Sequence, residues 1–449
     1  MSTLIITVFC GLLSWRLVYP PLALLLFIFL DPMTTPGTAA LMPFHAYVPR
    51  MAWGGLLGAA LTSMMRLWQA RNDGPGERFA WRVAVVCALM VVLIRLSIML
   101  KANLFGVGMD TASVGPLTLI ITLAYLHERR AWWCFGFMLV AQLCLAVYVV
   151  ANPGSRFNGV YASVEDMLGA QDLLRRKSEE GSIGSRVMGQ FTNTIMMATH
   201  AAVGLGAGLA LLIASRRLTL GRQIAAILAG IGLATAGVYL LVVSATRGTM
   251  IGVGFGILVH IFRARGLVRL PLFVGTLLSV FVVAPHLATL IPEDSPLWGR
   301  FALLRDLKET QEYRIEAMRR GFDAIPRNPV LGTGDHMSGA EACMGYMPHM
   351  GPLYLAVVYG IPVALMGCAV LFWAGVSDLT AAHVKKDKAF PALRAPRAFG
   401  TICYWTVMAC IMTNGYSGPG FMYMALGIAM WRMTCRRSVS PAASGYRTC

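Results

Sequence analysis

Long apolar runs dominate this chain and limit how it can fold. Most of them hold about 15–25 residues, the length at which a helix spans the hydrocarbon core of a bilayer. Charged residues make up only 13% of the sequence, against roughly 25% in soluble domains. Such a chain has too few charges to give many helices a solvated face. The sequence therefore predicts an all-α, polytopic integral membrane protein.

Each apolar run is a candidate transmembrane helix, which gives about 12 in all. The first run is broken by Arg16 and by Pro20-Pro21, so it is either one long helix or a short hairpin. The candidate spans cover residues 3–30, 50–66, 81–100, 111–126, 132–151, 193–214, 223–243, 249–263, 268–291, 350–374, 399–414 and 418–433.

Lysine and arginine alternate between the two sets of connecting loops. The basic loops are those around residues 66–82, 129–130, 216–222, 263–269, 385–397 and 432–437. The positive-inside rule places these loops in the cytoplasm. The formal net charge of +17 is then explained by loop position, and we expect no nucleic-acid partner, since no nucleic-acid module is visible.

This topology divides the chain into six parts. Two long loops face outward, and the second contains YRIEAMRRGFDAI, in which Ile315, Met318 and Phe322 recur at helical spacing. That pattern predicts an amphipathic helix at the membrane surface. The parts are N-terminal transmembrane helices (1–150), an outward loop (151–192), central transmembrane helices (193–291), a large outward loop (292–349), C-terminal transmembrane helices (350–433) and a cytoplasmic tail (434–449).

Arg247 stands between two apolar runs, in SATRGTMIGVGFGILV. A guanidinium at a helix centre costs roughly 2.5–3.5 kcal/mol even on the lenient insertion scale. The topology instead places Arg247 in a tight outward turn, just before the next helix begins. An arginine beside a helix N-terminus is a good phosphate site. The alternative is an arginine that only snorkels to the lipid headgroups.

Other cations lie on the same outward side. Arg186 ends the first long loop, Arg314 opens the amphipathic helix and Arg95 lies in the outer half of its span. Each alone is more often structural than functional. Together they favour an anionic ligand at the membrane boundary, and a lipid diphosphate is the obvious candidate.

Two outward histidines are candidate acid–base groups. His349 lies where the second long loop re-enters the membrane, and His336 lies in GTGDHM. A histidine there can move a proton near neutral pH, although it can also simply bond to backbone. We expect no metal and no cofactor, because His336, His349, Asp335 and Glu341 show no recognised ligand spacing. The ten cysteines contain no CxxC pair, so a disulfide framework or a zinc site is not expected.

Four motifs follow one another between about Gly184 and Pro362. An arginine and a glycine precede a span in RVMGQFTNTIMMA, and an arginine follows a Ser/Thr-rich turn in SATRGT. An arginine-led helix ends in a Pro-x-x-Gly-x-Gly turn in EYRIEAMRRGFDAIPRNPVLGTG, and a histidine opens the span HMGPLYLAVVYGIP. This order resembles the O-antigen ligase and O-antigen polymerase superfamily of bacterial envelope enzymes. The family usually has Asn after the histidine, where this chain has Met350.

The resemblance implies a GT-C-like fold and a metal-independent glycosyl transfer. The donor would be a saccharide on undecaprenyl diphosphate, and the acceptor a glycan or a lipid. Arg186 and Arg247 would clamp the diphosphate, Arg314 would support them, and His349 would be the base for the acceptor hydroxyl. Arg95 and His336 would be further substrate-binding residues.

The expected protein is therefore a multi-pass enzyme of the bacterial inner membrane whose active site faces the periplasm. It would polymerise repeat units or ligate them to an acceptor in exopolysaccharide or O-antigen biosynthesis, beside other polysaccharide assembly proteins. An alternative is a transporter or lipid-carrier flippase, although the midplane is poor in acids and shows no inverted repeat. A membrane scaffold without chemistry would leave the outward arginines unexplained.

Overall fold

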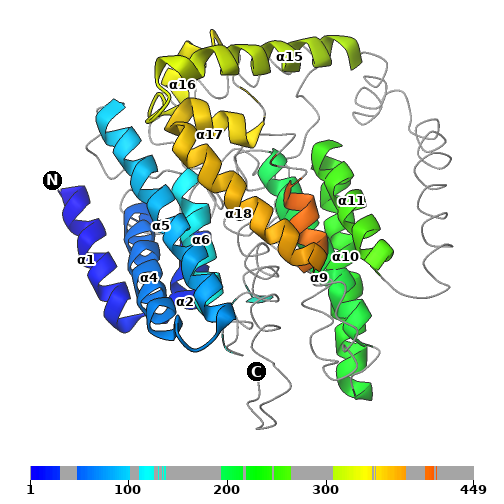
Figure 1. Cartoon of the computed structure of the whole chain (residues 1–449). Coiled ribbons are helices and arrows are strands. Elements are labelled where there is room, and N and C mark those ends of the chain that lie inside the picture. Colours follow the sequence, from blue (N-terminus) through cyan, green and yellow to red (C-terminus); the bar gives the residue numbers. More distant parts are fainter. Residues whose placement is uncertain are drawn as a thin grey trace.

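The computed structural model describes the greater part of the helical chain. Its described residues are 2–30, 48–101, 111–125, 130, 134, 136–137, 194–215, 219–244, 247–263, 307–345, 348, 350–380, 400–408 and 411. Within these residues the chain is helical and contains no strand, which agrees with the predicted all-α class. Figure 1 shows the helices gathered into a bundle, with α15 (Leu307–Ala324) lying across one end.

The N-terminal helices form one packed group. Helices α1 (Ser2–Leu17) and α2 (Pro20–Leu30) both pack against α4 (Val48–Ala70), which also contacts α5 (Pro75–Lys101) and α6 (Thr111–Tyr125). The predicted first span is therefore two helices, separated before Pro20, a residue suited to the first position of a helix. Helices α1 and α4 approach so closely that a Cβ on Gly58 would overlap the carbonyl of Gly11.

A second group consists of α9 (Thr194–Ser215), α10 (Leu220–Ser244) and α11 (Arg247–Arg263). Small residues let α9 and α10 come into backbone contact. A Cβ on Gly208 would lie 2.7 Å from the carbonyl oxygen of Gly230, and a Cβ on Gly237 would lie 2.8 Å from that of Ala201.

Residues 400–408 join the two groups. Cys403 lies against Gly206 of α9, and the carbonyl of Ile402 lies against Gly256 of α11. On the other side, Tyr404 Oη donates a hydrogen bond of 2.9 Å to the carbonyl of Leu371 in α18 (Ile361–Thr380). This helical segment is therefore held by α9, α11 and α18 together.

Within the described residues, two helices are long and apolar enough to cross a membrane, over Gly76–Lys101 in α5 and Leu220–Leu241 in α10, and shorter apolar helices accompany them. Their outer faces carry exposed apolar side chains. Exposure of these side chains to water would be unfavourable, whereas contact with lipid would suit them. These side chains include Leu89, Val92, Leu96, Leu100, Ile224, Leu228, Ile231 and Val238. The predicted spans 132–151 (apart from three isolated positions), 268–291 and 418–433 lie outside the described residues.

The predicted single span 350–374 is wrong, because the structure divides it into α17 (Gly351–Tyr359) and α18. The division falls at Gly360, whose φ of +92° is in the left-handed region that glycine tolerates best. The backbone N–H of Ile361 then donates to the carbonyl of Pro329, at 2.8 Å. The carbonyl of Pro329, in the second long loop, thus replaces the acceptor that a continuous helix would supply to Ile361.

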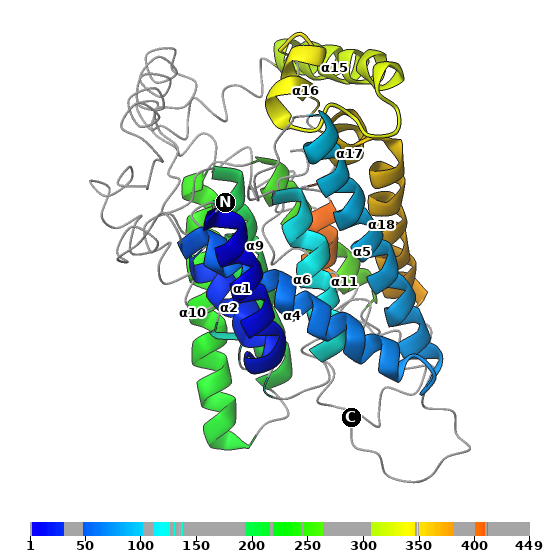
Figure 2. The ribbon, with the colours of Figure 1, turned by 90° about the vertical axis from the view of Figure 1, so that its left-hand side faces the viewer.

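The described part of the second outward loop covers one end of the bundle, which we call the outer end. It contains α15 (Leu307–Ala324), a 3₁₀ turn (Ile325–Arg327) and α16 (His336–Ala342). Figures 1 and 2 show α15 lying across this end, above α17. The predicted amphipathic helix is confirmed as a helix, and its place at a membrane surface stays a prediction.

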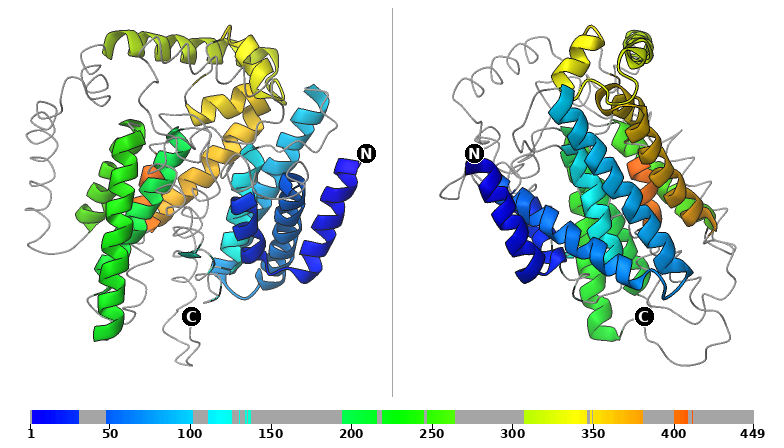
Figure 3. Two further views of the ribbon diagram at one scale, coloured as in Figure 1. Left: turned by 180° about the vertical axis from the view of Figure 1, so that it is seen from behind. Right: turned by 60° about the vertical axis from the view of Figure 1, so that its left-hand side comes forward.

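The turn that follows α15 is clamped between α5 and the junction of α17 with α18. Ser97 of α5 is fully buried, and its hydroxyl donates to the carbonyl of Leu331 and, at 3.4 Å, to that of Val358. One turn further along α5, Lys101 Nζ donates to Asn328 Oδ1 at 2.8 Å. Figure 3 shows α5 and α18 running side by side toward this end.

The same turn also pairs with α17 through its backbone. The N–H groups of Thr333 and Gly334 donate to the carbonyls of Val357 and Val358, at 3.0 and 2.8 Å. These bonds satisfy carbonyls at the end of α17 that have no partner within the helix. We call residues 328–335, together with Ser97 and Lys101, the outer clamp.

Replacing Gly360 with alanine should destabilise the outer end. The left-handed φ costs a non-glycine residue about 1–3 kcal/mol, and the new Cβ would also overlap the carbonyl of Val330. Thermal unfolding of the purified protein should therefore shift to lower temperature. Gly232→Ala on α10 is the matched control, because its Cβ meets no heavy atom within 4 Å and alanine favours a helix by about 1 kcal/mol over glycine. Equal unfolding temperatures for G360A and the control would contradict the clamp.

Candidate functional site

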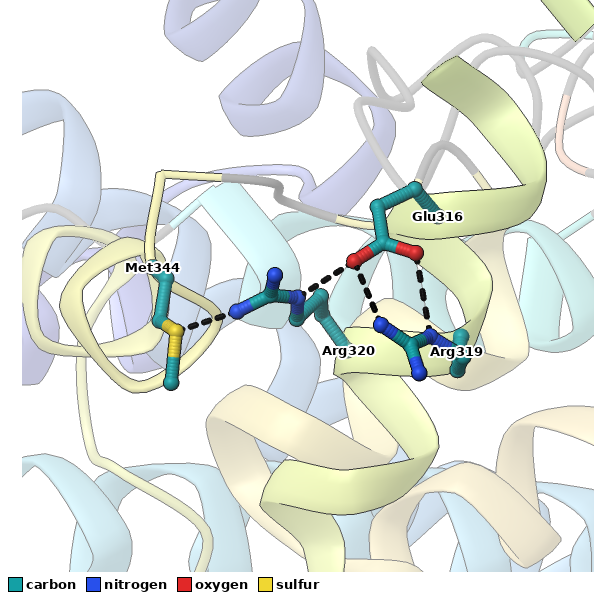
Figure 4. Close-up of polar contacts among 4 residues, drawn as sticks. All are labelled: Glu316, Arg319, Arg320 and Met344. Atoms are coloured by element: carbon teal, nitrogen blue, oxygen red, sulfur yellow. Dashed lines mark hydrogen bonds and ion pairs between the residues drawn. The ribbon is translucent and has the colours of Figure 1, made fainter. Parts of the chain in front are cut away.

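Glu316 gathers two of the arginines on α15. Its carboxylate accepts hydrogen bonds from Arg319, at 2.9 and 3.0 Å, and from Arg320 Nε at 2.6 Å (Figure 4). These hydrogen bonds, with Arg319 first and Arg320 second, lower the pKa of Glu316 to about 2. The hydrogen bond to Glu316 raises the pKa of Arg319 in turn. The contribution of this carboxylate to stability is present above the ordinary pKa of a glutamate and is lost as the pH falls toward 2.

Arg320 also links α15 to the turn after α16. Its second guanidinium branch donates to the sulfur of Met344 (Figure 4). Met344 has a φ of +53° and is followed by Gly345 at +84°, so the chain turns sharply at this point. The link ties α15 to the segment that leads back to α17.

Arg314 differs from these two arginines. It lies two positions before Glu316 in the sequence, which places it about 200° around the helix from Glu316. It is exposed, and among the described side chains it has no ion-pair partner. Of the three arginines described on α15, Arg314 is therefore the one whose charge is not balanced by Glu316.

Helix α15 packs closely on the start of α17. Its small residues Ala317, Gly321 and Ala324 are buried, and a Cβ on Gly321 would lie 3.1 Å from Leu353 Cδ2 and 3.3 Å from Pro348 Cγ. The helix that carries Arg314 thus presses on the residue next to His349.

Of the two predicted histidines, only the backbone of His336 is described. His349 is outside the described residues, but its neighbours are placed: Pro348 is buried against α15, and Met350 is the N-cap of α17. His336 is the first residue of α16, whose N-cap Asp335 accepts hydrogen bonds from Ser338 N at 2.9 Å and Ser338 Oγ at 2.6 Å. The side chain of His336 is not among those described.

Arg247 is the first residue of α11, two residues after α10 ends, which agrees with the predicted tight turn before a helix. Contacts with residues 400–408 show which way α11 runs. Gly256 meets Ile402, while Phe255 stacks on Trp405 with ring centroids 5.5 Å apart. A lower residue number in α11 therefore meets a higher one in 400–408, so the two segments are antiparallel.

This direction places Arg247 toward the outer end. Residues 400–408 lead outward, because Tyr404 meets Leu371 inside α18 whereas Ile411 meets Gly351 at the start of α17. Arg247 lies nine residues outward from Gly256, or about 13 Å along the helix. The start of α18 lies ten residues outward from Leu371, or about 15 Å. Arg247 and the outer clamp are therefore at similar depth.

Of the two remaining predicted residues, Arg95 contacts a ring within the N-terminal group. Arg95 of α5 lies over the ring of the buried Trp53, with its guanidinium carbon 4.8 Å from the ring centroid. Because Ser97 is only two residues further along α5, Arg95 and Ser97 point to different neighbours. Arg186 is outside the described residues. The roles of both in substrate binding stay predictions.

The sequence reasoning missed Ser97 and Glu316. A serine in an apolar helix normally bonds to its own helix, so only a tertiary contact reveals the role of Ser97. The Gly360-Ile-Pro362 sequence was the available signal for the break after α17, since glycine followed closely by proline often ends a helix. Among the described residues, no three His, Cys, Asp or Glu side chains are grouped to hold a metal ion.

Comparison with known proteins finds one family. Residues 231–368 match the O-antigen ligase family, and no curated protein matches the chain. The matched segment contains Arg247, Arg314, His336 and His349, together with residues 328–335 of the outer clamp, whereas Arg95 and Arg186 precede it. This match supports the predicted resemblance to the O-antigen ligase superfamily over residues 231–368.

Proposed function

We propose that this protein transfers a saccharide from undecaprenyl diphosphate to a glycan or lipid acceptor at the periplasmic face of the bacterial inner membrane. The transfer either polymerises repeat units or ligates them to an acceptor, in exopolysaccharide or O-antigen biosynthesis with other assembly proteins. The observation that carries the proposal is the family match over residues 231–368. That segment holds Arg247, Arg314 and His349, and the positions of α11 and α15 support a shared site for the two arginines.

The proposed site matches the charge changes of the reaction. The acceptor hydroxyl attacks the anomeric carbon, the bond from that carbon to the diphosphate breaks, and the diphosphate leaves with added negative charge. Arg247 and Arg314, with Arg186, stabilise that charge in place of a metal ion. His349 takes the proton of the hydroxyl as the new glycosidic bond forms.

The proposed architecture is GT-C-like, with about 12 transmembrane helices. Two long apolar helices and several shorter ones support a multi-pass arrangement. The clamp of the second loop onto α5 and α17 gives such a fold a fixed outer surface.

Arg247→Ala and His349→Ala should each abolish long-chain polysaccharide in cells while the protein level is unchanged. The first variant removes a cation that would stabilise the leaving diphosphate, and the second removes the base that would take the proton of the acceptor hydroxyl. Polysaccharide size is read on a gel beside an immunoblot of the protein. Arg216→Ala, in a predicted cytoplasmic loop, is the control. Normal product from both variants would falsify the proposed site.

Arg314→Ala should weaken donor binding, whereas Arg319→Ala should not. Arg319 is paired with Glu316, whereas Arg314 has no ion-pair partner among the described side chains and so offers its charge more readily to a diphosphate. One charge-assisted hydrogen bond is worth about 1.5–3 kcal/mol, so KM for the lipid-linked donor should rise at least about tenfold in R314A. Equal KM values in the two variants would show that the choice of arginine is wrong.

Purified protein should form longer products from a defined lipid-linked oligosaccharide in the presence of EDTA, at the same rate as without it. Arginines, not a metal ion, would hold the diphosphate. Products are sized by gel or mass spectrometry. Loss of product with EDTA, restored by a divalent cation, would contradict a metal-independent mechanism. A flippase would give no product under either condition.

A further inference from the structure

We propose that Met344 is an oxidation site, at which a hydroperoxide converts the thioether to a sulfoxide that Arg320 then holds more firmly. The product strengthens the join between α15 and the turn after α16. The inference concerns a chemical modification of the outer end, and it does not depend on the proposed glycosyl transfer.

Met344 occupies a backbone position that favours glycine. Its N–H donates to the carbonyl of Glu341 at 2.9 Å, and the N–H of Gly345 donates to that of Ala340 at 2.8 Å. These two bonds form a Schellman motif at the end of α16, in which glycine is the usual residue at the position of Met344. Within the described part of the chain, Met344 is the one non-glycine residue with a positive φ. A methionine is unfavourable for the backbone here, which indicates that its side chain has a role.

The side chain of Met344 brings its sulfur to a cation. Arg320 donates a hydrogen bond to that sulfur (Figure 4), and a thioether is only a weak acceptor. The Nε of the same guanidinium donates to Glu316 at 2.6 Å, which holds the group in place while Nη1 faces the sulfur. An oxygen atom added to this sulfur would therefore form beside a fixed cationic donor.

An oxidant can reach Met344, whereas it cannot easily reach the sulfur of the preceding residue. Met344 is 62% exposed, and Cys343 is fully buried. Burial raises the pKa of the Cys343 thiol, against a smaller opposite effect of the charge of Arg327, and the thiolate is the reactive form of cysteine. A hydroperoxide in solution therefore meets the thioether of Met344 before the thiol of Cys343.

The reaction is the transfer of one oxygen atom. A lone pair of the Met344 sulfur attacks the terminal oxygen of the hydroperoxide, and the O–O bond breaks. The proton of the transferred oxygen passes to the leaving oxygen, which departs as water or an alcohol. The sulfur is oxidised and the hydroperoxide is reduced. The sulfoxide oxygen carries partial negative charge, so it accepts from the Arg320 guanidinium a stronger, charge-assisted hydrogen bond than the thioether does.

Amide hydrogen exchange of the purified full-length protein, before and after treatment with hydrogen peroxide, tests this inference. Mass spectrometry of peptides should find a sulfoxide at Met344. Exchange at the end of α15 and in the turn after α16 should slow by about three- to tenfold, the effect of strengthening one hydrogen bond that resists local opening. Treatment with methionine sulfoxide reductase should reverse both changes.

Three variants separate Met344 from general oxidation of the protein. M344L keeps nearly the same side-chain volume but lacks the sulfur, so peroxide should leave its exchange unchanged. R320A removes the donor, so its Met344 should still form a sulfoxide without slower exchange. Met318 lies about 200° around α15 from Arg320, so M318L is the matched control and should respond as the wild type does.

Slower exchange after oxidation in the wild type and in M318L, but in neither M344L nor R320A, is the expected result. Equal slowing in M344L would overturn the inference, as would faster exchange in the oxidised wild type. An unmodified Met344 under conditions that oxidise Met318 would overturn it as well.

Discussion

The hydroxyl of Ser97 is the contact on which the outer end depends. It lies inside an apolar helix, yet it donates to two carbonyls from outside that helix, those of Leu331 and Val358. A buried carbonyl without a partner costs about 1–3 kcal/mol, so the pairing is favoured in a place that water does not reach. One side chain thereby fixes the turn, the end of α17 and α5 relative to one another. The positions of α15, α16 and the start of α17 follow from that fixed point.

Of the three arginines described on α15, two are paired with Glu316 and Arg314 is not. Glu316 holds Arg319 and Arg320 on one side of the helix, and Arg320 in addition contacts Met344. Their charges are used within the protein and keep α15 joined to the following turn. Arg314, on another side, is balanced by no described carboxylate. A count of basic residues would treat all three alike, although geometry separates them.

The sequence allowed the helical class and most positions of the described helices to be predicted, because apolar length is a local property. Helices α4, α5, α9, α10 and α11 lie close to the expected ranges. The break at Gly360 was missed, since the apolar run continues through it and only the bond from Ile361 to Pro329 shows why the helix stops. Ser97 was missed for a similar reason, because its role arises from carbonyls far away in the chain and hydropathy does not contain that information. The pairing of Glu316 with Arg319 and Arg320 is local, at the i,i+3 and i,i+4 spacing of a helix.

The bridge formed by residues 400–408 also has a consequence for how the protein is made. These residues are synthesised after α9, α11, α17 and α18, yet they contact three of those helices, and Ile411 contacts the fourth. A chain grows from its N-terminus, and its early parts fold first. The helices that carry Arg247 and the start of α17 therefore wait in the bilayer without their common neighbour until the last part of the chain is inserted. Completion of the outer end is thus a late event in the synthesis of the chain.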